Sequence, residues 1–109
     1  MKKEKNSCGG CFCDFYDDLR GISPSFQSIS IAENPVPLEV GPVPDTGGTF
    51  LVNSITLTRI DRDTCCAHFI VVTSFNPPVV VPGFPAGIYT AETVIACDKI
   101  VAFSPAGNE

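Results

Sequence analysis

The sequence predicts an all-β fold, an antiparallel β-sandwich of jelly-roll-like type that follows a flexible, cysteine-rich N-terminal arm. No segment of the 109 residues repeats apolar side chains every 3.6 residues over a useful length, which argues against helices. Instead, β-branched and aromatic residues form short runs that Pro, Gly and Asn separate. The length suits one domain with its own core. We place the arm at residues 1–22 and the β-sandwich domain at residues 23–109.

The expected strands differ in strength. They cover residues 26–32, 36–40, 49–60, 65–75, 79–81 and 91–103. The strands 49–60 and 65–75 are the strongest, and Asp61-Arg62-Asp63 between them is typical of a hairpin turn. The strand 79–81 is expected at a sheet edge because prolines flank it.

The strand 65–75 has apolar residues in both of its alternating sets, which favours a strand that is covered on both faces. One face can pack inside the domain. We expect another subunit to cover the other face, with Ile70 and Val72 as interface residues. An overfilled single core with one exposed apolar face is the alternative.

The arm is polar and charged and fits no strand pattern. Phe12, Phe15 and Tyr16 are nevertheless spaced so that they can form a short amphipathic helix on docking, or simply attach the arm to a partner. These three aromatic residues are therefore candidates for the assembly interface.

Six cysteines lie in three places, and all six are candidates for disulfides between subunits. They are Cys8, Cys11 and Cys13 in the arm, the adjacent pair Cys65 and Cys66, and Cys97. Neighbouring cysteines on one strand rarely pair with each other, because a disulfide needs Cα atoms about 4.4–6.8 Å apart and converging side chains. We expect at least one arm cysteine to pair with Cys65, Cys66 or Cys97 of a neighbouring subunit. A staple within one chain is the alternative.

The sequence argues against several classes of function. A net charge of −5 with only seven Lys and Arg argues against a nucleic-acid partner. No apolar run approaches the roughly 18 residues of a membrane span, and no apolar stretch follows the lysine-rich start, so we expect no membrane partner and no signal peptide.

We also expect neither a cofactor nor an enzyme. Common catalytic motifs are missing from the sequence. Cys66 and His68 share a strand face, but at about 6.6–7 Å they are too far apart for proton transfer. A small zinc-binding protein is the remaining alternative, because Cys8-Gly9-Gly10-Cys11 has the spacing of half a zinc knuckle.

Three stretches carry a family pattern. In residues 54–71, a strand that ends in Arg59-Ile60-Asp61-Arg62 leads into Cys65-Cys66-Ala67 and a second apolar strand. Cys11-Phe12-Cys13-Asp14 lies near the start of the chain, and residues 94–105, with Cys97 and a final Phe-Ser-Pro, lie near its end. Together they resemble the CotY/CotZ/ExsY family of spore coat and exosporium proteins.

This resemblance implies a self-assembling structural protein of the bacterial spore surface, in the coat, the exosporium or an appendage. Such a protein would be made in the mother-cell cytoplasm, polymerise with itself and with other spore coat proteins, and then be cross-linked by disulfides. A shortened relative, such as the subunit of a pilus-like spore appendage fibre, is the alternative.

Overall fold

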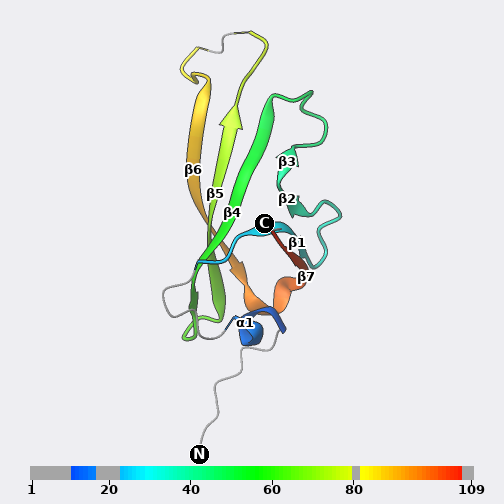
Figure 1. The fold of residues 1–109 in the computed structure, drawn as a ribbon, viewed down its shortest axis with the longest axis vertical. Helices are drawn as coiled ribbons and strands as arrows, with labels where there is room; N and C mark the ends of the chain where they lie inside the picture. The colour runs from blue at the N-terminus through cyan, green and yellow to red at the C-terminus, as the bar shows by residue number, and fades with distance from the viewer. Residues whose placement is uncertain (1–10, 17–22, 80–81, 107–109) are drawn as a thin grey trace, which may run out of the picture.

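The protein folds as two antiparallel β-sheets and one short helix, as a computed structural model shows for residues 11–16, 23–79 and 82–106 (Figure 1). The elements are α1 (Cys11–Phe15), β1 (Phe26–Ile31), β2 (Leu38–Glu39), β3 (Gly41–Pro42), β4 (Phe50–Asp61), β5 (Cys66–Phe75), β6 (Gly87–Ala96), the 3-10 turn η1 (Cys97–Lys99) and β7 (Ile100–Pro105). The predicted all-β class is confirmed, whereas the jelly-roll-like sandwich stays a prediction.

The two sheets differ greatly in length. The four-stranded sheet, in the order β3-β4-β5-β6, is built from strands of 10–12 residues apart from the two-residue β3, and we call it the long sheet. The three-stranded sheet, in the order β2-β1-β7, has no strand longer than six residues, and we call it the short sheet. The short sheet lies beside only one half of the long strands (Figure 1).

The core lies at the end of the molecule that carries α1, which we call the base. Both sheets contribute to one buried cluster there, including Ile29 of β1 with Leu57 and Phe69 of the long sheet. The opposite end, where β5 joins β6, is called the tip (Figure 1). Alternation along β5 is regular, because Ala67, Phe69 and Val71 are buried while the residues between them are half-buried.

The strand between residues 91 and 103 was expected to be continuous, and this prediction is wrong. It is interrupted by η1, after which the chain leaves the long sheet and continues as β7 of the short sheet. Two other strands are shorter than predicted. Only Leu38–Glu39 pairs within residues 36–40, where Pro37 lacks a ladder donor, and Val79 is not in a strand while residues 80–81 lie outside the described part.

The turn between β4 and β5 forms where it was predicted. The Asp63 amide donates a hydrogen bond of 3.0 Å to Asp61 Oδ1, which is an Asx turn, and Cys65 takes a positive φ of 56°. The Asp63 hydrogen bond is the main reason that the pKa of Asp61 lies below its usual value.

Candidate assembly and cross-linking sites

Helix α1 is docked into the body although its residues were predicted to belong to the arm. Phe12 is completely buried and its ring meets four others, with centroids 4.9–5.7 Å apart, in Tyr16, Phe26, Phe69 and Phe103. A five-residue helix has little stability of its own, so this aromatic packing is what holds it. Of the two possibilities for these aromatic residues, the docked helix is the one observed.

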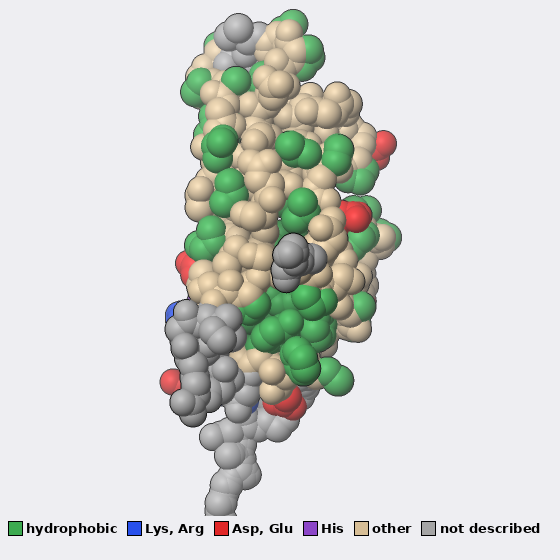
Figure 2. Space-filling view, viewed as in Figure 1, with side chains coloured by type: hydrophobic (Ala, Val, Ile, Leu, Met, Phe, Trp, Pro, Cys, Tyr) green, Lys and Arg blue, Asp and Glu red, His purple; other side chains and the backbone are tan. Residues whose placement is uncertain are grey.

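The three aromatic interface candidates therefore differ in how deeply they are buried. Phe12 belongs to the core of its own chain, which corrects its expected role in assembly. Tyr16 is half-buried, and burial raises the pKa of its hydroxyl. Phe15 keeps 71% of its surface exposed, so it alone of the three presents a large apolar surface. Figure 2 shows an apolar patch on the surface near the base.

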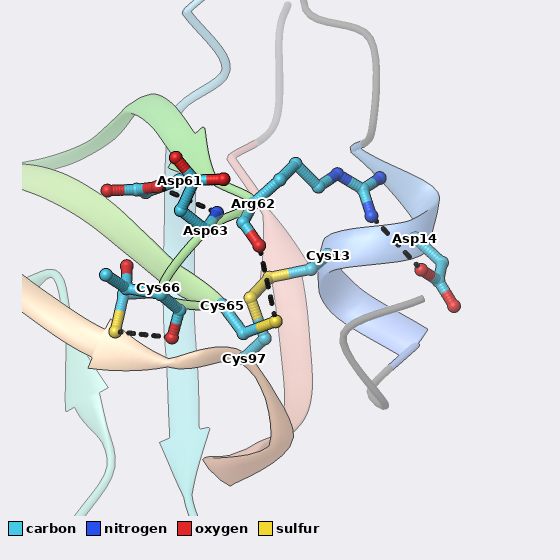
Figure 3. The surroundings of a disulfide bond; sticks show 9 residues. Cys13, Asp14, Asp61, Arg62, Asp63, Cys65, Cys66 and Cys97 are labelled. Atoms are coloured by element: carbon cyan, nitrogen blue, oxygen red, sulfur yellow. Dashed lines mark hydrogen bonds and ion pairs between the residues drawn. A yellow bond between two sulfur atoms is a disulfide. The ribbon is translucent and has the colours of Figure 1, made fainter. Parts of the chain in front are cut away.

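Cys13 and Cys97 form a disulfide within one chain, with Cα atoms 5.7 Å apart across 84 residues of sequence (Figure 3). Both side chains are completely buried. The Cys97 amide donates a 2.8 Å hydrogen bond to the Cys65 carbonyl, which ties η1 to the β4–β5 turn. For these two cysteines the structure shows the intrachain staple, which corrects the expectation that they link subunits.

Cys65 is also disulfide-bonded and lies half-buried against the core. Its sulfur lies 3.7 Å from the carbonyl oxygen of Arg62. Cys8 lies outside the described residues. The two cysteines that remain as free thiols in the described part of the chain are Cys11 and Cys66.

Cys66 points away from α1 and from the Cys13–Cys97 disulfide (Figure 3). It begins β5 and is paired with Asp61 of β4 on one side and Ala96 of β6 on the other. Since the next residue, Ala67, faces the core, Cys66 faces the outer surface of the long sheet. Its thiol lies 3.5 Å from the Thr64 carbonyl oxygen, which accepts its weak hydrogen bond.

His68 lies on the same outer surface and contacts Glu92 of β6, with Nδ1 and Oε2 3.0 Å apart. Ile70 and Val72 follow on that surface and are half-buried, opposite Glu92 and Thr90 of β6. Both therefore stay candidates for an interface. Among the described residues, no three His, Cys, Asp or Glu side chains form a group that could hold a metal ion.

Strand β6 is the feature that sequence reasoning missed. Residues 87–92 are exposed throughout, on both faces of the sheet, and Ile88 reaches 70% exposure. Among the described strands, none pairs with the outer edge of β6. The sequence contains no local signal for this, because whether a strand lies at an edge or in the centre depends on the order of the strands.

The tip also carries a shallow apolar cleft of about 400 Å³. It is lined by residues of the long sheet and of the adjoining loops, among them Leu51, Phe75 and Ile88. Beside it, Phe75 packs on Phe50, Phe84 and Tyr89 with ring centroids 4.8–6.4 Å apart. This small aromatic group is separate from the core cluster at the base.

Comparison with known proteins identifies no relative: no family model matches the chain, and neither a curated protein nor a solved structure is significantly similar to it. No helix in the described ranges is both long and apolar enough for a membrane crossing.

Proposed function

We propose that this protein is a self-assembling structural subunit that polymerises through contacts of its β-sheets and is then fixed by disulfides between subunits. One observation carries the proposal: β6 is a ten-residue edge strand that is exposed along most of its length. An open edge of this kind presents backbone donors and acceptors that another chain can pair with.

The other strand edges have features that oppose association, and β6 lacks them. β2 and β3 are two residues long, and β3 contains Pro42. β7 ends in Pro105, and its pairing with β1 contains register shifts. β6 pairs with β5 without a register shift over all ten residues, contains no proline, and has Glu92 as its one charged residue. Natural sheets prevent edge-to-edge association with short edge strands, prolines, bulges and charged side chains, and β6 is the edge that has the fewest of these features.

The apolar side chains on β6 support the same conclusion. Ile88, Tyr89 and Val94 are all exposed, and they belong to both faces of the strand. A strand that is exposed on both faces and at its edge contributes little to the stability of the monomer, whereas a neighbouring subunit would cover all three surfaces.

The site of action that we propose is the bacterial spore surface, in line with the resemblance to the CotY/CotZ/ExsY family. In this setting the chain is made in the reducing mother-cell cytoplasm and is oxidised later, which accommodates lasting disulfides. One heterologous contact gives a ring or a helical fibre, depending on the rotation between subunits, whereas a lattice needs a second contact.

A matched pair of substitutions tests the role of β6. Ile88→Lys places a charge beside the open edge, while Val79→Lys places the same charge on a residue of equal exposure, 70%, that lies in a loop. We expect negative-stain microscopy to show ordered polymers for the parent and for Val79→Lys but monomers for Ile88→Lys, with unchanged circular dichroism in all three. Equal assembly of both variants would contradict the proposal.

A second pair of substitutions tests the outer surface of the long sheet. Ile70→Lys with Val72→Lys should weaken assembly while the β-signature of the circular dichroism spectrum survives, because half-buried lysines can extend their ammonium groups to water. Simultaneous loss of assembly and of β-structure would show that these two residues serve only the fold.

A further inference from the structure

We infer that the covalent link between subunits is a disulfide from Cys11 of one copy to Cys66 of the next. The inference rests on the proposed self-assembly and specifies its chemistry. Cys11 and Cys66 are the free thiols of the described chain, and each lies near an exposed apolar side chain, Phe15 for Cys11 and Val94 for Cys66.

The two free cysteines lie on different sides of the long sheet. Cys66 is held in the ladder by β4 and β6 and faces the outer surface of the long sheet. Cys11 begins α1, whose next two residues are fixed in the core on the other side of that sheet by aromatic packing and by the Cys13–Cys97 disulfide. A disulfide needs close Cα atoms and converging side chains, so we expect oxidation to join two copies.

Both surfaces place an apolar side chain next to the free thiol. On α1, Cys11 and Phe15 are four residues apart and lie on the same side of the helix, with Cβ atoms about 5–6 Å apart. On the long sheet, Val94 is the diagonal neighbour of Cys66, because Cys66 pairs with Ala96, and such neighbours are about 7–8 Å apart. Phe15 can therefore pack on Val94, which is 50% exposed, while Cys11 reaches Cys66.

Charged residues flank both surfaces. Asp14, exposed on α1, forms a 4.0 Å ion pair with Arg62 of its own chain, a separation at which a surface pair contributes little. Arg59 is opposite His68 and so lies on the outer surface close to Cys66, where it is largely exposed beside Asp61. An incoming α1 brings its carboxylate towards this guanidinium but also towards Asp61 and Glu92 on the same surface. The choice of a second copy of this chain as the occupant therefore rests on the two free thiols and on the exposed Phe15 and Val94.

The chemistry is a pair of thiol–disulfide exchanges with a low-molecular-weight disulfide as the oxidant. The Cys66 thiolate attacks the small disulfide, forms a mixed disulfide and releases one small thiol. The Cys11 thiolate of the second copy then attacks the Cys66 sulfur and releases the other small thiol. Two protein thiols are oxidised and one small disulfide is reduced to two thiols. Because the two surfaces differ, the link is head-to-tail and extends into a chain.

Complementary single variants test this pairing. The full-length Cys11→Ser and Cys66→Ser proteins are oxidised separately and as an equal mixture with oxidised glutathione, and free thiols are then blocked. We expect monomers from each variant alone, dimers but no longer species from the mixture, and a ladder from the parent on non-reducing electrophoresis. Mass spectrometry of the dimer should find the Cys11 peptide joined to the Cys66 peptide. Cross-linking of either variant alone to the level of the mixture, or a Cys11–Cys66 link in the monomer band, would overturn the inference.

Two further measurements sharpen the result. Val94→Ser should lower the initial yield of parent cross-links about tenfold, the loss expected from one buried apolar contact, whereas Val36→Ser, at 51% exposure in a loop, should leave it unchanged. Equal yields would contradict the docking surface.

The Cys11→Ser/Cys66→Ser double variant separates the cross-link from the proposed function. If this variant still forms polymers by microscopy while the mixture of single variants gives no dimer, only the cross-link is wrong. If neither the parent nor any variant polymerises, the proposed function is wrong.

Discussion

The base and the tip of the long sheet are made from the same strands but have opposite surroundings. At the base, β4 and β5 are covered by the short sheet and by α1, and Ile55, Leu57 and Phe69 are completely buried. At the tip, the same strands continue with β6 beyond the short sheet, and residues 87–92 of β6 are exposed. We therefore expect the base to supply most of the stability of the monomer, and we propose that assembly covers the tip.

The largest expected effect comes from removing the aromatic residue that docks α1. Phe12→Ala should lower the free energy of unfolding by about 3–5 kcal/mol, because it removes a completely buried ring at the base. Phe84→Ala removes a half-exposed ring at the tip and should cost less than about 1 kcal/mol. Denaturant unfolding of the monomers, with disulfides intact, measures both. Equal losses would abolish the distinction between the two ends.

The Cys13–Cys97 disulfide also acts at the base. Replacing both cysteines with alanine should lower the free energy of unfolding by about 2–5 kcal/mol, because the bond closes a long loop in the unfolded chain. The matched control replaces Cys11 and Cys66, which also removes two sulfur atoms but no bond. Comparable destabilisation by the control would show that the effect belongs to thiol packing.

Hydrogen exchange should distinguish the ends without any substitution. In the monomer, the amides of β6 that face the open edge have no strand partner among the described residues and should exchange faster than those of β5, which is paired on both sides. Assembly should slow the β6 amides selectively. If their exchange rates stay the same in polymers, β6 is not part of the interface.

The sequence was informative where a local pattern decides the structure. The strands β4 and β5 and the turn at Asp61 formed close to the predicted residues, because β-branched residues and an Asx turn act over short distances. The break at η1 was missed, because Cys97 and its neighbours are compatible with an extended strand, and only packing across two sheets decides that the chain turns there.

The candidate sites were predictable in composition but not in pairing. The six cysteines were identified as the reactive residues, yet which of them meet depends on the docking of α1, and this in turn depends on aromatic residues from four separate parts of the chain. Likewise, Phe12 and Phe15 are both phenylalanines, three residues apart. Which of them is buried depends on which side of the docked helix faces the core.

The smallest predicted effect concerns pH and the turn at the base. The Asp63 amide holds the pKa of Asp61 below its unfolded value of about 3.9, so ionised Asp61 stabilises the fold above that pH. As the pH falls below about 4, the unfolded chain takes up the proton first, and this contribution is lost as the pH passes through the lower pKa of the folded state. Asp61→Asn keeps an acceptor oxygen for the Asp63 amide but cannot ionise. Its free energy of unfolding should therefore fall less steeply between pH 5 and pH 2 than that of the parent, by roughly the amount that one surface hydrogen bond to a charged group allows. Identical slopes in urea titrations across this range would show that the carboxylate does not support the turn.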